Sequence, residues 1–166
     1  MIELIVLDVD GTLTNGSITY DEKGIESKTF DVKDGLAIAT WTKKLNKKAA
    51  IITGRKSNIV EKRAKELGVT YLYQNIDNKD EILEKIRKKE NLSYNQIAII
   101  GDDLNDIKML QKAGLSFCPQ DAVPYIKKIV HKVCQNSGGN GAVRNMIDHI
   151  CFEDNIEEDF IKVWIK

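Results

Sequence analysis

Long apolar segments are missing from this chain of 166 residues, and it has only two prolines. No uninterrupted apolar run approaches the roughly 18 residues that suggest a membrane-spanning helix, and no basic leader precedes the first apolar residues. We therefore expect neither a membrane protein nor a secreted one. Without a proline-rich linker, the length suits one domain over residues 1–166 that can bury its own core.

The chain also has few cysteines and no formal net charge. The three cysteines, Cys118, Cys134 and Cys151, form no Cys-x-x-Cys motif, which favours reduced thiols in a cytoplasmic protein. His131 and His149 fit no common zinc spacing, so we expect them to pack within the fold. Twenty-five Lys and Arg residues balance 25 Asp and Glu residues. This balance argues against nucleic-acid or membrane binding, which usually needs a broad basic surface.

Short apolar strands alternate with helical segments along most of the chain. The expected strands cover residues 2–7, 48–53, 71–73, 97–101 and 115–118, and the expected helices cover residues 35–46, 57–67, 79–90, 104–113 and 122–129. This alternation predicts a Rossmann-like, doubly wound α/β fold with a mainly parallel sheet. Ligands of such sheets bind beyond the carboxyl ends of the strands.

Two segments depart from this alternation. Residues 15–30 contain two β-rich arms around a Gly-containing turn, which predicts a hairpin that projects above the end of the first strand. Residues 153–159 carry five acids in seven positions. They predict a solvated turn before an apolar docking tail at residues 160–165, within a C-terminal extension over residues 151–166.

Acidic residues follow the first expected strand. Asp8 and Asp10 lie two positions apart, so their side chains share one side of the strand end, and Gly11 allows a sharp turn there. Two carboxylates this close repel each other unless a cation joins them. Alone, the motif marks a turn or a calcium-type ligand more often than a catalytic site, but its position after a buried strand favours catalysis.

A second acidic group follows the strand at residues 97–101. It contains Asp102, Asp103 and Asp106, which are more acids than a helix N-cap needs, although we expect one of them to cap. Because both groups follow parallel strands, they should meet in the crevice of the sheet. Their hard oxygen ligands suit Mg²⁺.

Two further segment ends supply groups for an anion. Thr53, Gly54 and Arg55 offer a hydroxyl, open backbone N–H groups and a cation, which together can hold a phosphoryl oxygen. Thr53 can also simply cap the next helix. Lys79 opens the following helix, where the helix dipole slightly disfavours a cation, although most helix lysines are only solvated.

In order, these motifs resemble the four motifs of the haloacid dehalogenase-like phosphatase superfamily. They are Asp8-x-Asp10-Gly-Thr, Thr53-Gly-Arg, Lys79 and Gly101-Asp-Asp-x-x-Asp106. The resemblance implies that Asp8 is the nucleophile and Asp10 the general acid and base. It also implies that Thr53 and Lys79 hold the phosphate.

The same resemblance implies a magnesium site. Asp8, Asp102 and the main-chain carbonyl of Asp10 would hold Mg²⁺, and Asp103 and Asp106 would support these ligands. The chemistry is consistent, because a phosphate dianion that approaches Asp8 is repelled until cations offset the charge. In-line attack would then form an aspartyl-phosphate. Asp8→Asn should keep the fold and lose turnover.

The spacing leaves no room for a cap domain. Only 42 residues, 11–52, separate Asp10 from Thr53, and they must form the hairpin, a helix and a strand. The site would then be open to water, which costs selectivity. A neighbouring subunit is the simplest lid.

Further motifs are similar to those of the capless phosphatases of 3-deoxy-D-manno-octulosonate 8-phosphate. They are Leu13-Thr-Asn-Gly16, Phe30-Asp-Val-Lys-Asp-Gly-Leu-Ala-Ile38 and Ser137-Gly-Gly-Asn-Gly-Ala-Val-Arg144. The similarity implies a homotetramer in which hairpins and Gly-rich tails, residues 137–144, complete neighbouring sites. It also implies that a phosphorylated sugar acid contacts Lys33, Gly54, Arg55 and Arg144.

The chain departs from that family at two positions. The family usually has an arginine where Lys33 stands and an acid where Asn145 stands. The 160–165 tail resembles that of phosphatases acting on nine-carbon, sialic-type sugar acid 9-phosphates, whereas Arg55 favours the octulosonate group. A nine-carbon substrate is therefore the alternative.

A phospho-acceptor signalling domain is the alternative from a different class. It shares the doubly wound fold, Mg²⁺, a lysine and an acid pair after the first strand. It also needs an acceptor Asp after the third strand, where this chain has Gln74 and Asn75. A mutase or phosphotransferase of the superfamily would need a cap to exclude water.

Overall fold

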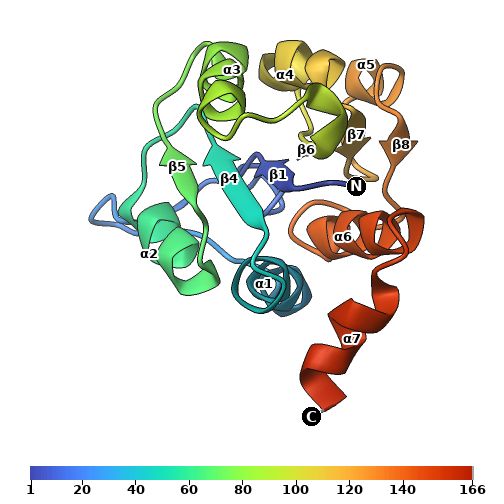
Figure 1. Ribbon diagram of the computed structural model, residues 1–166. Coiled ribbons are helices and arrows are strands. Elements are labelled where there is room, and N and C mark those ends of the chain that lie inside the picture. Colours follow the sequence, from blue (N-terminus) through green and yellow to red (C-terminus); the bar gives the residue numbers. More distant parts are fainter. Residues whose placement is uncertain (166) are drawn as a thin grey trace.

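A six-stranded parallel sheet forms the centre of the computed structural model, which describes residues 1–165 (Figure 1). In spatial order the strands are β5 (Tyr71–Tyr73), β4 (Lys48–Ile52), β1 (Leu4–Leu7), β6 (Ile97–Ile100), β7 (Leu115–Cys118) and β8 (Lys132–Val133). β1 lies between β4 and β6, with Leu7 in register with Ile51 and Ile100. All its residues are buried, as expected for a central parallel strand with helices on both faces.

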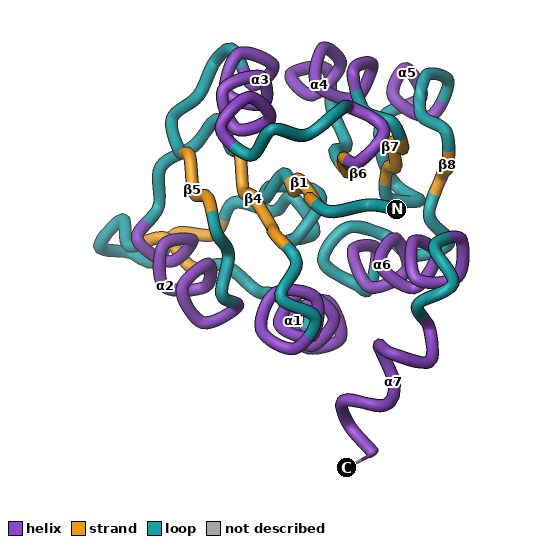
Figure 2. The backbone as a smooth tube through the Cα atoms, in the orientation of Figure 1, coloured by secondary structure: helices purple, strands orange, loops and turns teal. Residues whose placement is uncertain are grey.

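Helices cover both faces of this sheet (Figures 1 and 2). One face carries α3 (Lys79–Lys89), α4 (Ile107–Lys112) and α5 (Pro124–Lys127), and the other carries α1 (Val32–Ala39), α2 (Asn58–Leu67) and α6 (Ala142–Glu153). Within β1, Leu4 and Val6 pack in the core layer beneath α3, α4 and α5, and Ile5 and Leu7 pack in the layer beneath α1, α2 and α6. The predicted doubly wound α/β fold is confirmed.

The predicted hairpin is also present. β2 (Thr19–Tyr20) pairs with β3 (Glu26–Ser27) in an antiparallel ribbon apart from the main sheet. The Asp21 carboxylate closes its turn by accepting the N–H groups of Lys23 and Ile25, at 2.9 and 2.8 Å.

Several helix boundaries differ from the expected ones. α1 begins at Val32 rather than at residue 35, because Asp31 caps it by accepting the N–H groups of Lys33 and Asp34. It continues as a π-helical turn, Thr40–Lys44. The segment expected as one helix at residues 104–113 is a 3₁₀ turn, Leu104–Asp106, followed by α4. A second 3₁₀ turn, Tyr94–Gln96, precedes β6.

The acidic segment 153–159 leaves the helices only at residues 154–156, so the solvated turn is shorter than expected. α6 continues to Glu153, and three residues separate it from a further helix, α7 (Glu157–Ile165). Acids in the first turn of α7 favour the helix because they face the positive end of its dipole. α7 docks through the buried Phe160, and the Trp164 indole donates to the Thr40 hydroxyl at 3.2 Å.

The three cysteines are free and buried, as predicted. Burial raises the pKa of Cys118 to about 11, and that of Cys134 and Cys151 to about 12. These thiols are therefore packing groups rather than nucleophiles. Among residues 1–165, no helix combines the length and apolarity that a bilayer crossing requires.

Candidate active site

Asp8 lies at the carboxyl end of β1, almost completely buried. Its N–H donates to the Ile100 carbonyl at 3.2 Å, which continues the parallel pairing by one residue. The chain then turns sharply, because the N–H groups of Thr12, Leu13 and Thr14 all donate to the Val9 carbonyl at 2.9–3.2 Å. Asp8 is thus held between a strand and a tight loop.

Lys79 from α3 pairs with two carboxylates inside the protein. Its Nζ lies 2.6 Å from Asp8 Oδ1 and 2.6 Å from Asp106 Oδ1, and its side chain is only 1% exposed. Burial alone would lower the pKa of Lys79, but the charges of Asp8 and Asp106 raise it. Burial, then the charge of Asp106, raises the pKa of Asp8 well above its ordinary value, although Lys79 opposes the shift.

Three carboxylates lie close together at the end of the sheet. One oxygen each of Asp8, Asp102 and Asp106 lies within 4.8 Å of the others. Burial and the charge of Asp106 raise the pKa of Asp102 to about 6. Crowded acids with raised pKa values gain most from a divalent cation, and carboxylate oxygens are the donors that Mg²⁺ prefers. The cluster therefore fits a magnesium ion.

The Asp8 loop and the Asp102 loop approach so closely that Gly11 must be glycine. Its φ is 100°, and a Cβ there would lie 2.0 Å from Asp102 Oδ2. The Thr12 hydroxyl donates to the other oxygen of Asp102 at 3.3 Å. The two acidic groups of the sequence thus meet in the crevice, as predicted.

Asp103 and Asp106 have different positions. Asp106 is fully buried, and besides meeting Lys79 it accepts the N–H groups of Asp102 and Asp103 at 3.0 and 3.4 Å. Asp103 is exposed and caps the 3₁₀ turn by accepting the Leu104 N–H at 2.7 Å. One of the three acids therefore caps, as expected, and it is Asp103.

The Thr53 turn lies beside the same crevice. Thr53 is buried and its hydroxyl accepts the Arg55 N–H at 3.4 Å. Ser57, not Thr53, caps α2, so the alternative that Thr53 is only a cap is wrong. A Cβ on Gly54 would lie 3.9 Å from the Asn105 side chain, which places this turn next to the Asp102 loop.

Two cations meet Asp10: Lys28 from the hairpin and Arg55 from the Thr53 turn. Lys28 forms an ion pair and hydrogen bond with Asp10 Oδ1, and Arg55 Nε lies 3.9 Å from Asp10 Oδ2. Glu26 joins them, at 3.4 Å from Lys28 Nζ and 2.6 Å from Arg55 Nη2. Sequence reasoning missed Lys28, because a lone lysine in a β arm carries no signal until the arm folds over the strand end.

The Gly-rich segment, residues 137–144, lies close to the candidate site within a single chain. It packs on its own chain's Asp8 loop, with the Gly139 N–H donating to the Thr12 carbonyl at 3.0 Å. A Cβ on Gly138 would lie 1.9 Å from the Gly11 carbonyl oxygen. The glycines thus permit close backbone approach within one chain, and the completion of a neighbouring site by this tail stays a prediction.

Arg144 and Lys33 line a different cavity. Arg144 Nε donates to Asp148 at 2.7–2.8 Å, and its guanidinium lies 5.8 Å from the Phe160 ring centre. The cavity of about 700 Å³ that both cations line contains neither Asp8 nor Asp102. Within one chain, the structure therefore does not bring them to the acid cluster.

Comparisons with known proteins agree with this geometry. A family model of haloacid dehalogenase-like hydrolases matches residues 71–147. The 3-deoxy-D-manno-octulosonate 8-phosphate phosphatase of Escherichia coli (strain K12) is 40% identical over 148 residues, which cover 89% of this chain and 78% of that protein. The chain belongs to this phosphatase family. The corresponding phosphatase of Yersinia pestis is 37% identical over 158 residues, which cover 94% of this chain and 83% of that protein.

Solved structures of the family share the fold. The enzyme of Moraxella catarrhalis, in complex with a magnesium ion, a phosphate ion and a KDO molecule, superposes with a TM-score of 0.93. It is 37% identical, and the match covers 98% of this chain and 93% of that one. The cobalt-bound enzyme of Haemophilus influenzae has a TM-score of 0.87 and 34% identity, over 93% and 90% of the two chains.

Proposed function

We propose that this protein is a single-domain, Mg²⁺-dependent phosphatase that releases phosphate from 3-deoxy-D-manno-octulosonate 8-phosphate. The observation that carries the proposal is the buried cluster of Lys79 with Asp8, Asp102 and Asp106, found in a chain that is 40% identical to phosphatases of that substrate. The cluster supplies a nucleophile, a cation and a metal site at one strand end.

Asp8 is the nucleophile of this reaction. Its carboxylate oxygen attacks phosphorus in line and forms an aspartyl-phosphate as the bond to the sugar oxygen breaks. Lys79, held 2.6 Å from Asp8, offsets the charge of the incoming dianion. Thr53, buried beside the crevice, holds a phosphoryl oxygen. Asp8, Asp102 and the Asp10 carbonyl would hold Mg²⁺, which would neutralise charge on the phosphate.

Asp10 is the general acid and base. It gives its proton to the departing sugar oxygen, and it then takes a proton from the water that attacks the aspartyl-phosphate. This second step releases inorganic phosphate and restores both carboxyl groups. Its carboxylate is 19% exposed, so it faces the open side of the site where a leaving group and water can enter.

We also propose a cytoplasmic homotetramer in which hairpins cover neighbouring sites. The hairpin exposes the apolar side chains of Ile18, Tyr20 and Ile25, a patch that a partner subunit would bury. Arg55 contacts the substrate at the mouth of its own site. Lys33 and Arg144 would contact substrate across a subunit interface. Light scattering should give a mass near four chains, and a monomer with full substrate selectivity would contradict the assembly.

Phosphate release is the direct test. We expect activity with Mg²⁺, loss of it with a chelator, and the highest kcat/KM on octulosonate 8-phosphate among a panel that includes nine-carbon sugar acid 9-phosphates and hexose phosphates. A preference for a nine-carbon compound would identify the alternative substrate. Equal rates on all three classes would leave only a general phosphatase, and no metal-dependent release would refute the proposal.

A further inference from the structure

Lys28 is a buried lysine whose charge is directed at Asp10. Its side chain is only 2% exposed, and its ammonium is paired with Asp10 and lies 3.4 Å from Glu26. A buried ammonium is costly unless it is paired, so this lysine depends on these two carboxylates. Partial burial would raise the pKa of Glu26, but Lys28 and Arg55 lower it.

These contacts close a ring of four charges at the mouth of the site. Asp10 contacts Lys28, Lys28 contacts Glu26, Glu26 contacts Arg55, and Arg55 Nε lies 3.9 Å from Asp10. Tyr20 adds a contact at 3.2 Å from Arg55 Nη2. Hairpin residues thus hold both cations that face the Asp10 carboxylate.

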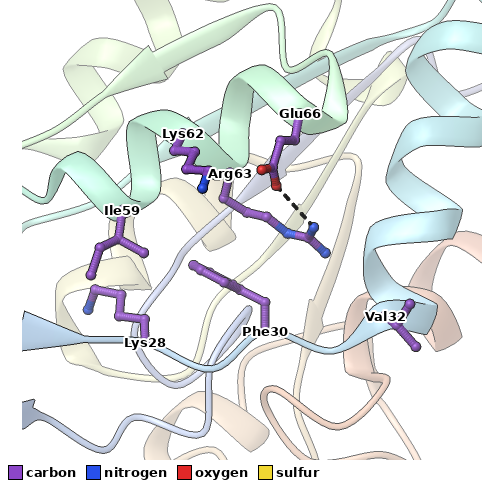
Figure 3. Close-up of a pocket in the computed structure, with 7 residues that line it drawn as sticks. All are labelled: Lys28, Phe30, Val32, Ile59, Lys62, Arg63 and Glu66. Carbon is purple, nitrogen blue, oxygen red and sulfur yellow. Dashed lines mark hydrogen bonds and ion pairs between the residues drawn. The ribbon is translucent and has the colours of Figure 1, made fainter.

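The stem of Lys28 lies near apolar side chains. It lines a pocket of about 340 Å³ together with Phe30 and Ile59 (Figure 3). Figure 3 shows the Lys28 ammonium at the far end of this pocket from the Arg63 guanidinium, which pairs with Glu66 instead. The other acid of α2, Glu61, accepts a hydrogen bond from Gln74, so Lys28 pairs with Asp10 and Glu26 alone among the described residues.

We propose that Lys28 is a positioning residue, which orients the Asp10 carboxyl group toward the leaving oxygen of the substrate. This inference rests on the proposed function, in which Asp10 is the general acid. Lys28 touches Asp10 rather than the reacting atoms, and it couples the placement of the hairpin to the chemistry. A misplacement of about 1 Å in a catalytic group can cost about a hundredfold in rate.

Leaving-group dependence tests this role. A sugar alkoxide needs a proton as it departs, whereas the p-nitrophenolate of an aryl phosphate does not. Lys28→Met should lower kcat/KM for the sugar phosphate by about 10–100-fold and leave that for p-nitrophenyl phosphate within about threefold. The ratio kcat/KM is used because it reports formation of the aspartyl-phosphate and not its later hydrolysis.

Matched variants separate positioning from general damage to the hairpin. Lys23→Met removes an exposed lysine of the same hairpin and should change neither substrate. Lys28→Arg, which keeps the cation, should restore part of the activity on the sugar phosphate. If Lys28→Met melts far below wild type, Lys28→Gln is measured in its place.

A double-mutant cycle gives the decisive outcome. Asp10→Asn should produce the same selective loss, and adding Lys28→Met to it should cause no further loss, because Lys28 acts through Asp10. Equal losses on both substrates, no loss, or additive losses would overturn the inference. A wild-type protein without metal-dependent phosphatase activity would instead refute the proposed function, so the two failures are distinguishable.

Discussion

The ammonium of Lys79 lies 2.6 Å from the carboxylate of Asp8, although 71 positions separate the two residues in the chain. The parallel sheet explains the contact. β1 and β5 end at the same edge of the sheet, so Asp8, which follows β1, lies on the same side as Lys79, which begins the helix after β5. Asp106 lies at the same distance from Lys79 on its other side. One buried cation thus faces two buried acids, and this excess of negative charge is what a metal ion would balance.

Asp8→Asn should abolish turnover and preserve the fold. The amide has the size of the carboxylate, and Lys79 keeps Asp106 as a partner, but an amide cannot attack phosphorus to form the acyl phosphate. We expect a loss of at least about a thousandfold in kcat, measured by phosphate release, with the far-ultraviolet circular dichroism spectrum of wild type. Near-wild-type activity of this variant would contradict the assignment of Asp8 as the nucleophile.

Lys79→Met should destabilise the metal-free protein as well as inactivate it. It leaves Asp8 and Asp106 buried without their cation, a change that costs about 3–5 kcal/mol when a buried ion pair is broken. Urea unfolding would measure the loss, and Mg²⁺ should restore more stability to this variant than to wild type. Lys65→Met, at an exposed position of α2, is the control and should be silent. A variant as stable as wild type would show that the pair contributes nothing.

Gly138→Ala should impair the site from a distance. Its Cβ would meet the Gly11 carbonyl at 1.9 Å, and since that atom is backbone the Asp8 loop must move. We expect about a tenfold or greater loss in kcat/KM. Gly24→Ala, in the hairpin turn with open space around it, should cost only about 1 kcal/mol of stability from its positive φ. Equal activities of the two variants would contradict the packing role of the Gly-rich segment.

Asp34→Asn should flatten the dependence of stability on pH. The Asp34 carboxyl accepts the Arg144 N–H at 2.7 Å, but its Oδ2 is buried without a partner. Burial raises the pKa of Asp34 from 3.8 to about 6. The folded state therefore binds a proton that the unfolded state releases, and stability falls as pH rises through the window between about 4 and 6.

The side chain of the asparagine variant cannot titrate. Between pH 4 and pH 8, the free energy of unfolding of this variant should therefore fall by up to about 3 kcal/mol less than that of wild type. Urea unfolding at both pH values measures the difference. Asp8 and Asp102 titrate alike in both proteins and cancel in the comparison. Glu22→Gln, an exposed control, should follow wild type. Identical pH slopes for Asp34→Asn and wild type would refute this role of Asp34.

Local signals predicted the sheet and the acid cluster well. Apolar runs such as Ile97–Ile100 are buried on both faces, so they read as strands without knowledge of their neighbours. Strand ends of a parallel sheet share one edge, so Asp8 and Asp102 could be placed together from their positions in the sequence. The helix start at Val32 was missed, although the capping residue Asp31 is a local signal that the sequence did contain.

The sequence by itself determined the doubly wound fold and the meeting of Asp8 and Asp102 at its edge, because periodicity and strand-end position are local properties. Lys79 was added to this group by the resemblance of the four motifs to those of a known superfamily. Only the tertiary structure decided that Lys28 meets Asp10, that Gly138 packs on Gly11, and that Arg144 turns to Asp148. The first two contacts join segments whose approach depends on how a hairpin and a loop fold over the sheet. For Arg144, an acid one helical turn away competes for the guanidinium, and only the packed helix shows which partner it takes.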